Sequence, residues 1–357
     1  MSEYIHGGDI YSQPVRLDFS INVNPLGIPE GVKAAAAASI ERCGVYPDSR
    51  CTSLVEALSR AEGVKEEQIV CGNGAADLIF GLALALKPKK ALVAAPSFAE
   101  YEKALETVGC RTEHFFLQEE EDFAVRPEMV REALERYDGE GEEKLDLLFL
   151  CSPNNPTGQA VKREEMEEIA RWCRQRKIWL AVDQCFEGFL EKPKDHSITP
   201  SLGQFPNLMV LKAFTKSYAM AGLRLGYALC GSGELAERLR QVRQPWSVSA
   251  VAQAAGLAAL EEKDYLQQAR ELVASERPWL SARLEELGMK VYPSQVNYLL
   301  FRAPGKKKLK ESLLRKGILI RSCANFPGLG PDVYRVCIRR REENEQLLAA
   351  LQEIKEG

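Results

Sequence analysis

Short apolar runs that alternate with a helical pattern constrain the fold of this chain most. Five such runs, each flanked by turn residues, are typical of buried strands; they span residues 91–95, 145–150, 178–182, 208–211 and 226–229. Between two of them, apolar residues at i, i+3, i+4 and i+7 predict one buried helix face, formed by Met166, Ile169, Ala170 and Cys173. Strand and helix in this alternation predict an α/β layer with a mostly parallel central sheet.

The two ends of the chain have a different pattern. We predict a helix at 32–42, a long helical stretch at 249–288 that is interrupted at Pro278, strands at 297–302, 318–321 and 334–338, and a closing helix at 342–354. This mixture is typical of an α+β unit. We therefore expect a large domain at 47–245 and a smaller domain built from both chain ends, 1–46 and 246–357.

Composition and charge favour a cytoplasmic globular protein. The chain has 357 residues, 45% of them hydrophobic, and a formal charge of −4, so neither nucleic acid nor a membrane surface is an expected partner. The N-terminus lacks the pattern of a signal peptide. The ten cysteines include no CxxC pair and the three histidines have no ligand-like spacing, so we expect reduced thiols and no metal site.

The segment VLKAFTKSYAMAGLRLGY at 210–227 carries the first candidate for chemistry. Lys216 follows a predicted strand, and strand ends deliver catalytic groups in an open α/β sheet. A lysine that forms a Schiff base must be able to lose its proton, which partial burial and neighbouring cations promote. Arg224 can supply such a cation and can also bind a phosphate.

Three other segments place polar groups after predicted strands. Asn155 lies in LCSPNNPTG at 150–158, where a tight turn is the alternative interpretation. Asp183 ends an apolar strand, where a carboxylate is costly unless it meets a cation such as a protonated pyridine nitrogen. In IVCGNGAADL at 69–78, Gly74, Ala75 and Ala76 let backbone N–H groups approach an anion at a helix N-terminus.

The joint order of these segments resembles the fold-type-I aminotransferase superfamily, whose enzymes use pyridoxal 5′-phosphate (PLP). The resemblance rests on the glycine turn, Phe98 after a strand, SPNNPTG, Asp183 and TKSYAMAGLRLG, and it runs from about Gly7 to the C-terminal helix. Within that superfamily the chain is similar to the histidinol-phosphate aminotransferase branch. The implied fold is α/β, with a mostly parallel central sheet in a large domain and a smaller α+β domain.

The resemblance implies a role for each matching residue. Lys216 would hold PLP as a Schiff base and move protons, Asp183 would pair with the pyridine nitrogen, and Asn155 would bind the phenolic oxygen. Phe98 would stack on the ring, and the cofactor phosphate would be held by Gly74, Ala75, Ala76, Thr215 and Arg224. Tyr46 would reach the phosphate in a partner subunit, which implies a homodimer with shared active sites, and Arg335 would bind the substrate carboxylate.

Two positions depart from the pattern of many relatives. Phe186 stands where they have a tyrosine, which removes one hydroxyl from the ring oxygen. Ala213 stands where they have a hydroxyl residue, so phosphate binding at that position must be thinner or rearranged.

The ends of the chain bear on which bond at the substrate Cα is broken. HGGDIY at 6–11, DFSINVNPLG at 18–27 and RSCANFPGLG at 321–330 resemble threonine-phosphate decarboxylases, which make aminopropanol phosphate for cobalamin. Candidate ligands of the substrate phosphate or carboxylate are Arg321, His6, Asn24 and Arg339. For Arg339, the alternative interpretation is an ordinary surface charge. For His6, it is a contact that stabilises a helix or a turn. Transamination of histidinol phosphate, and a PLP-binding sensor without catalysis, remain alternatives.

Overall fold

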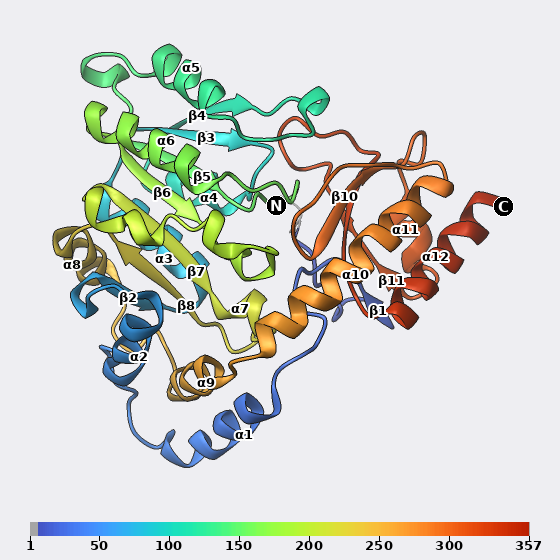
Figure 1. The fold of residues 1–357 in the computed structure, drawn as a ribbon, viewed down its shortest axis with the longest axis horizontal. Coiled ribbons are helices and arrows are strands. Elements are labelled where there is room, and N and C mark those ends of the chain that lie inside the picture. Colours follow the sequence, from blue (N-terminus) through green and yellow to red (C-terminus); the bar gives the residue numbers. More distant parts are fainter. Residues whose placement is uncertain (1–5, 357) are drawn as a thin grey trace.

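The computed structural model describes residues 6–356 and contains a seven-stranded sheet with the order β2-β8-β7-β6-β5-β3-β4 (Figure 1). Its strands are β2 (Ile69–Gly72), β3 (Lys90–Ala95), β4 (Arg111–Phe116), β5 (Leu147–Cys151), β6 (Trp179–Asp183), β7 (Leu208–Ala213) and β8 (Gly226–Cys230). β8 pairs antiparallel with β2 and β7, and the other neighbouring strands of this sheet pair parallel. The prediction of a mostly parallel sheet is therefore confirmed. Each of the five predicted strands begins within two residues of the observed first residue.

Both faces of this sheet are buried. Alternate residues of each strand point to opposite sides, and both sets pack in an apolar cluster. Leu148 and Leu150 pack in one apolar cluster, while Leu147 and Phe149 pack in the other. The first cluster is covered by α2 (Thr52–Glu62), α5 (Pro127–Tyr137), α6 (Arg163–Arg176) and α9 (Ala250–Glu261). The second is covered by α3 (Gly74–Leu86), α4 (Glu100–Glu106) and α8 (Gly233–Val242). The predicted buried face of α6 is confirmed.

A second sheet has the order β12-β13-β10-β9 and is antiparallel. It consists of β9 (Lys290–Val291), β10 (Tyr298–Arg302), β12 (Arg321–Ser322) and β13 (Val333–Cys337), and α11 (Leu309–Leu314) and α12 (Arg341–Glu356) lie beside it. The N-terminal β1 (Leu17–Asp18) pairs with β11 (Ile318–Leu319), so both chain ends meet here. The exact domain boundaries at 47 and 245 stay a prediction.

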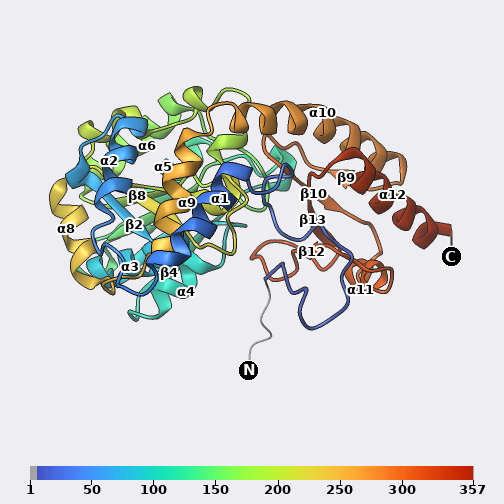
Figure 2. The ribbon, with the colours of Figure 1, turned by 90° about the horizontal axis from the view of Figure 1, so that it is seen from below.

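The helix α10 (Tyr265–Glu286) extends from the large sheet to the second sheet (Figure 2). The predicted interruption at Pro278 is wrong, because Pro278 lies inside α10 and the break falls at residues 262–264 instead. Apolar side chains on both sides of the proline, such as Val273 and Leu280, are buried in one core, so packing holds the helix together despite the missing backbone donor.

The predicted strand at 318–321 is also corrected, since it consists of two short pieces. Ile318–Leu319 pairs with β1, whereas Arg321–Ser322 pairs with β13, so the chain changes partners at Ile320. The predicted helix at 32–42 begins earlier, as α1 (Glu30–Ser39), and ends in a 3-10 turn at Ile40–Arg42.

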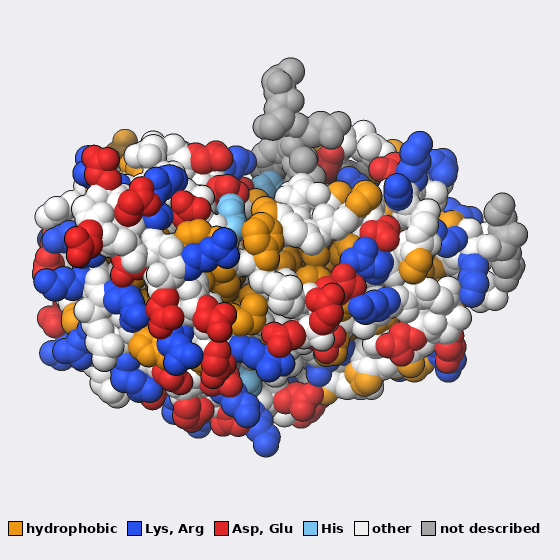
Figure 3. Space-filling model, turned by 90° about the horizontal axis from the view of Figure 1, so that it is seen from above, with side chains coloured by type: hydrophobic (Ala, Val, Ile, Leu, Met, Phe, Trp, Pro, Cys, Tyr) orange, Lys and Arg blue, Asp and Glu red, His pale blue; other side chains and the backbone are white. Residues whose placement is uncertain are grey.

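The next features concern the surface side chains, the cysteines, and the helices and side-chain groups of the described residues. On the face seen in Figure 3, charged side chains of both signs are intermixed, and apolar side chains gather between the two halves of the molecule. All ten cysteines are free thiols. Across residues 6–356, no helix has the length and apolar character needed to cross a bilayer, and no three potential metal ligands of the His, Cys, Asp and Glu types are grouped.

Candidate active site

A pocket of about 170 Å³ lies where the large-domain strands end, at the edge where parallel sheets bind ligands. The structure brings together in its wall most residues that the sequence predicted for cofactor binding: Ala75, Ala76, Phe98, Asn155, Asp183, Thr215, Lys216 and Arg224. They follow β2, β3, β5, β6 and β7 along the chain. Distant segments thus converge because their strands share one edge of the sheet.

Lys216 lies in the single helical turn α7 (Phe214–Ser217), directly after β7. Burial lowers the pKa of its amine to about 8, and the nearby positive charges of Arg335 and Arg224 act in the same direction. A substantial neutral fraction near neutral pH is what a nucleophilic lysine needs. The geometry therefore supports the predicted role of Lys216 in Schiff-base chemistry.

The buried Asn24 holds the backbone of this turn. Its backbone N–H donates to the carbonyl oxygen of Lys216 at 3.0 Å, and its side-chain amide donates to that of Ser217 at 2.8 Å. Its side-chain oxygen accepts from the backbone N–H of Leu26. Asn24 was predicted as a substrate ligand, but these bonds indicate that it positions Lys216.

Asp183, at the end of β6, is buried and held by two donors. The Tyr101 hydroxyl donates to one carboxylate oxygen at 2.7 Å, and the backbone N–H of Cys185 donates to the other at 2.9 Å. Tyr101 is fully buried and its ring stacks on Phe149, 4.9 Å away. Sequence reasoning missed Tyr101; its position three residues after Phe98, near a strand end, was the available signal.

The N-terminus of α3 and Arg224 form a cradle for an anion. Gly74 has a φ of +78°, and a Cβ there would lie 2.5 Å from a terminal nitrogen of Arg224. Only glycine therefore allows the guanidinium to approach the first turn of the helix. The free N–H groups of that turn and the guanidinium together suit a phosphate, and Thr215 lies in the same pocket wall.

This pocket has a group that matches each polar part of PLP. It offers an amine for the aldehyde, a carboxylate for the pyridine nitrogen and an anion cradle for the phosphate. The side-chain oxygen of Asn155 accepts a hydrogen bond from Arg335, so the Asn155 amide nitrogen remains available to donate to the ring oxygen. These groups fit PLP.

The two departures from the family pattern lie in the same wall. Phe186 and Ala213 both line the pocket, and the Phe186 ring packs edge-on against Tyr298 with 5.0 Å between centroids. These two positions supply no hydroxyl to a ligand, so the polar contacts must come from Asn155, Thr215 and the cradle.

Arg321 and Arg335 form a pair of buried cations beside this pocket. They are register partners on β12 and β13, and they lie 5% and 6% exposed. Arg335 donates to Asn155 and to the carbonyl oxygen of Ser20, and Arg321 donates to the amide oxygen of Asn325. Burial lowers the pKa of Arg321 to about 10, and the charge of Arg335 adds to the effect.

Within the described part of the chain, neither guanidinium forms an ion pair with a carboxylate. The Nε of Arg335 is buried without a hydrogen-bond partner. Two adjacent buried cations that form no ion pair are costly unless a ligand supplies negative groups. This arrangement is typical of a site for an anionic substrate.

Two other predicted residues, His6 and Arg339, each have a carboxylate partner within the chain. The His6 ring nitrogen Nε2 lies 2.7 Å from a Glu100 oxygen and its ring 6.2 Å from that of Phe98. Arg339 donates to Glu343 at 2.8 Å and to the carbonyl oxygen of Asp18, so its charge is already matched. That pairing favours the alternative interpretation for Arg339.

Tyr46 lies outside the pocket of its own chain. Its side chain is 77% exposed, and its ring stacks on Trp246 with 4.5 Å between centroids. Val45 is exposed beside it. An exposed aromatic patch of this kind is suited to contact with another chain.

Comparisons with known proteins agree with this geometry. Residues 15–351 match the model of the family "Aminotransferase class I and II". The chain is 38% identical to the threonine-phosphate decarboxylase of Salmonella typhimurium, covering 99% of this chain and 97% of that protein. It is 33% identical to the histidinol-phosphate aminotransferase of Oleidesulfovibrio alaskensis, covering 97% and 88%.

A solved structure shows the same fold. The histidinol-phosphate aminotransferase of Clostridium acetobutylicum superposes with a TM-score of 0.86 at 28% identity, covering 95% of this chain and 99% of that one. With the family model spanning nearly the whole sequence and a pocket that fits the cofactor, this chain belongs to the PLP-dependent class I and II aminotransferase family.

Proposed function

We propose that this protein decarboxylates L-threonine O-3-phosphate to aminopropanol phosphate, a step of cobalamin biosynthesis. The observation that carries the proposal is the buried pair Arg321 and Arg335 beside the Lys216 pocket, which forms no ion pair with a carboxylate of residues 6–356. A phosphorylated amino acid supplies the two anionic groups that this pair needs. The more similar of the two named relatives is a threonine-phosphate decarboxylase, which favours decarboxylation over transamination.

We assign each group of the pocket a task. PLP, when bound, accepts the electron pair released as a bond at the substrate Cα breaks. Asp183, held by Tyr101, would pair with the pyridine nitrogen, and Asn155 would donate to the ring oxygen. Lys216 Nζ anchors the cofactor and, after carbon dioxide has left, delivers a proton to Cα.

Other residues hold the cofactor and the substrate. Phe98 would stack on the ring, and the cofactor phosphate would be held by Gly74, Ala75, Ala76, Thr215 and Arg224. We assign the substrate carboxylate to Arg335 and the substrate phosphate to Arg321; His6, whose ring lies 6.2 Å from that of Phe98, is a further candidate ligand of the substrate. This division follows from Arg335 donating a hydrogen bond to Asn155 in the pocket wall, whereas Arg321 donates to Asn325.

A two-substrate assay tests the proposed reaction. The purified enzyme with PLP receives L-threonine O-3-phosphate in one tube, and glutamate with imidazole-acetol phosphate in another. Carbon dioxide release in the first tube is the expected result. Consumption of glutamate in the second tube without carbon dioxide release in the first would instead establish the aminotransferase.

The Lys216→Ala variant tests the assignment of the lysine. The wild-type protein with PLP should be yellow, and the variant should lose that visible absorbance because the covalent link is gone. Lys65→Ala is the control, because Lys65 is exposed and lies outside the active-site pocket. Unchanged absorbance of Lys216→Ala after dialysis would contradict the assignment.

We further propose a homodimer in which Tyr46 contacts the cofactor phosphate of the partner subunit. The exposed stack of Tyr46 on Trp246 supports this proposal. Mixing inactive Lys216→Ala chains with Tyr46→Ala chains should restore activity, because each hybrid dimer contains one intact site. A mixture no more active than its separate components, despite hybrid dimers seen by native mass spectrometry, would contradict it.

The ten free thiols support a cytoplasmic location, which cell fractionation tests.

A further inference from the structure

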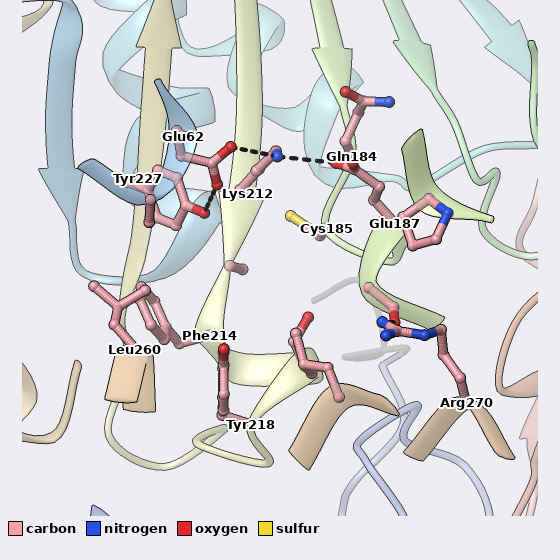
Figure 4. A pocket seen from close by; sticks show the side chains of 16 residues that line it. Glu62, Gln184, Cys185, Glu187, Lys212, Phe214, Tyr218, Tyr227, Leu260 and Arg270 are labelled. Carbon is pink, nitrogen blue, oxygen red and sulfur yellow. Dashed lines mark hydrogen bonds and ion pairs between the residues drawn. The ribbon is translucent and has the colours of Figure 1, made fainter. Parts of the chain in front are cut away.

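A second cavity, of about 310 Å³, adjoins the active-site pocket (Figure 4). Cys185 and Ala213 line both spaces. Its wall includes α7, the turn that carries Lys216, through Phe214 and Ser217. None of the tasks assigned above uses this cavity, although it shares its walls with the site that performs them.

One wall of the second cavity carries a buried cluster of charges. Lys212 Nζ lies 2.8 Å from a carboxylate oxygen of Glu62 and 3.0 Å from one of Glu187. The Tyr227 hydroxyl donates to the other oxygen of Glu62, as Figure 4 shows. With one cation and two carboxylates, this wall has a net charge of −1.

A positive group lies on another side of the same cavity. Arg270, on α10, donates to the side chain of Gln267 and to the carbonyl oxygen of Gly188, and no ion pair joins it to a carboxylate within residues 6–356. Figure 4 shows it at the opposite end of the view from the Glu62 cluster. Among the described residues, Arg270 thus lines the cavity without a carboxylate in direct contact.

The Tyr218 hydroxyl adds an unused donor. The Tyr218 ring is stacked 5.7 Å from Tyr265 and packs 5.4 Å from Phe214, so its direction is set by packing. Its hydroxyl makes no side-chain hydrogen bond among the described residues. Leu260 and Leu266 complete the wall with apolar surface.

We propose that this cavity binds a free α-amino acid as its zwitterion. The carboxylate would meet Arg270 and the Tyr218 hydroxyl, the ammonium would face the Glu62–Lys212–Glu187 cluster, and an apolar side chain would lie against Leu260 and Leu266. Small-molecule pockets begin at roughly 300 Å³, so the volume suits a ligand of this size. A phosphate dianion is disfavoured by the two carboxylates. The proposal goes beyond the proposed function, because this ligand is not the substrate.

The probe must be unable to enter the chemistry at Lys216. N,N-dimethyl-L-leucine keeps both charges and the apolar side chain, but its tertiary amine cannot form an imine. Calorimetric titration of the PLP-loaded enzyme should show saturable binding with one site per chain and no change in visible absorbance. The same titration with 4-methylpentanoate, which lacks the ammonium, should show affinity lower by about tenfold or more, the loss expected for one charged hydrogen bond.

Variants locate the binding. Arg270→Gln should weaken it by about tenfold or more, Tyr218→Phe should weaken it less, and Leu266→Trp should abolish it by filling the cavity. Arg283→Gln is the matched control, because Arg283 is exposed on the same helix and outside the cavity. Circular dichroism establishes that each variant is folded, and Leu266→Trp keeps the test decisive should Arg270→Gln fail to fold.

Three results would overturn the proposal: no saturable binding to the wild-type enzyme, equal binding by wild type, Arg270→Gln and Leu266→Trp, or displacement of the probe by L-threonine O-3-phosphate in competition for one site. Because the readout is binding rather than turnover, the outcome is independent of whether the enzyme proves to be the decarboxylase.

Discussion

The pKa values of Lys212 and Lys216 should be shifted in opposite directions, although both side chains are buried. Burial lowers the pKa of Lys216 to about 8, with the charge of Arg335 as the next contribution. Burial alone would lower the pKa of Lys212 as well, but the carboxylates of Glu187 and Glu62 more than offset it and raise that pKa. The difference therefore arises from the neighbours of each amine and not from depth.

The consequence for reactivity is large. At pH 7.5, about one quarter of Lys216 amines would be neutral, against about one in a thousand for a lysine at the ordinary value of 10.5. The ratio is about 200-fold in favour of Lys216. Because the pKa of Lys212 is raised, its neutral fraction should be smaller than that of an ordinary lysine.

Competitive acetylation of the cofactor-free enzyme measures both lysines in one experiment. The protein is labelled with trace acetic anhydride at a series of pH values, and mass spectrometry gives the labelled fraction of each lysine. The labelling midpoint of Lys216 should fall near pH 8, while Lys212 should remain unlabelled until well above the midpoint of the exposed lysines. Because reagent access differs between sites, the midpoint is compared and not the rate.

The Arg335→Leu variant extends the test. Removing that positive charge should move the pKa of Lys216 upward, because a protonated amine no longer meets a like charge. Arg283→Leu, on the surface of α10, should leave it unchanged. A Lys216 midpoint at or above that of exposed lysines, or one unmoved by Arg335→Leu, would refute the electrostatic reasoning.

Three further substitutions have defined outcomes. Asp183→Asn should lower kcat by about a hundredfold or more with little change in KM, because the carboxylate acts on charge that develops during the reaction; a change confined to KM in steady-state assays would contradict this. Tyr101→Phe removes a buried hydrogen bond to Asp183 and should reduce the free energy of unfolding by about 1.5–3 kcal/mol, measured in urea. Lys212→Met leaves the carboxylates of Glu62 and Glu187 without their cation and should reduce it by about 3–5 kcal/mol; an effect as small as that of the exposed control Lys65→Met would show that the cluster contributes little.

The residues that follow strands could be placed in the active site from the sequence. Asp183, Asn155 and Lys216 each come shortly after an apolar run, and the carboxyl ends of parallel strands lie at one edge of a sheet. Local order along the chain therefore predicted a shared pocket, and the structure brings all three into its wall. The same reasoning placed Gly74 at the start of a helix, where its positive φ and its approach to Arg224 now explain the glycine.

Contacts that depend on packing between distant segments could not be predicted from the sequence. Tyr101 reaches Asp183 only because α4 packs against the large sheet. Asn24 holds the Lys216 turn across 192 positions of sequence, and the pairing of Arg321 with Arg335 depends on the register of two short strands. Helix continuity at Pro278 likewise depends on the core that both halves of α10 share. Periodicity and turn residues report the local conformation of a segment, whereas these contacts depend on the angle and register at which segments meet, and those follow from how side chains far apart in the chain fill a common core.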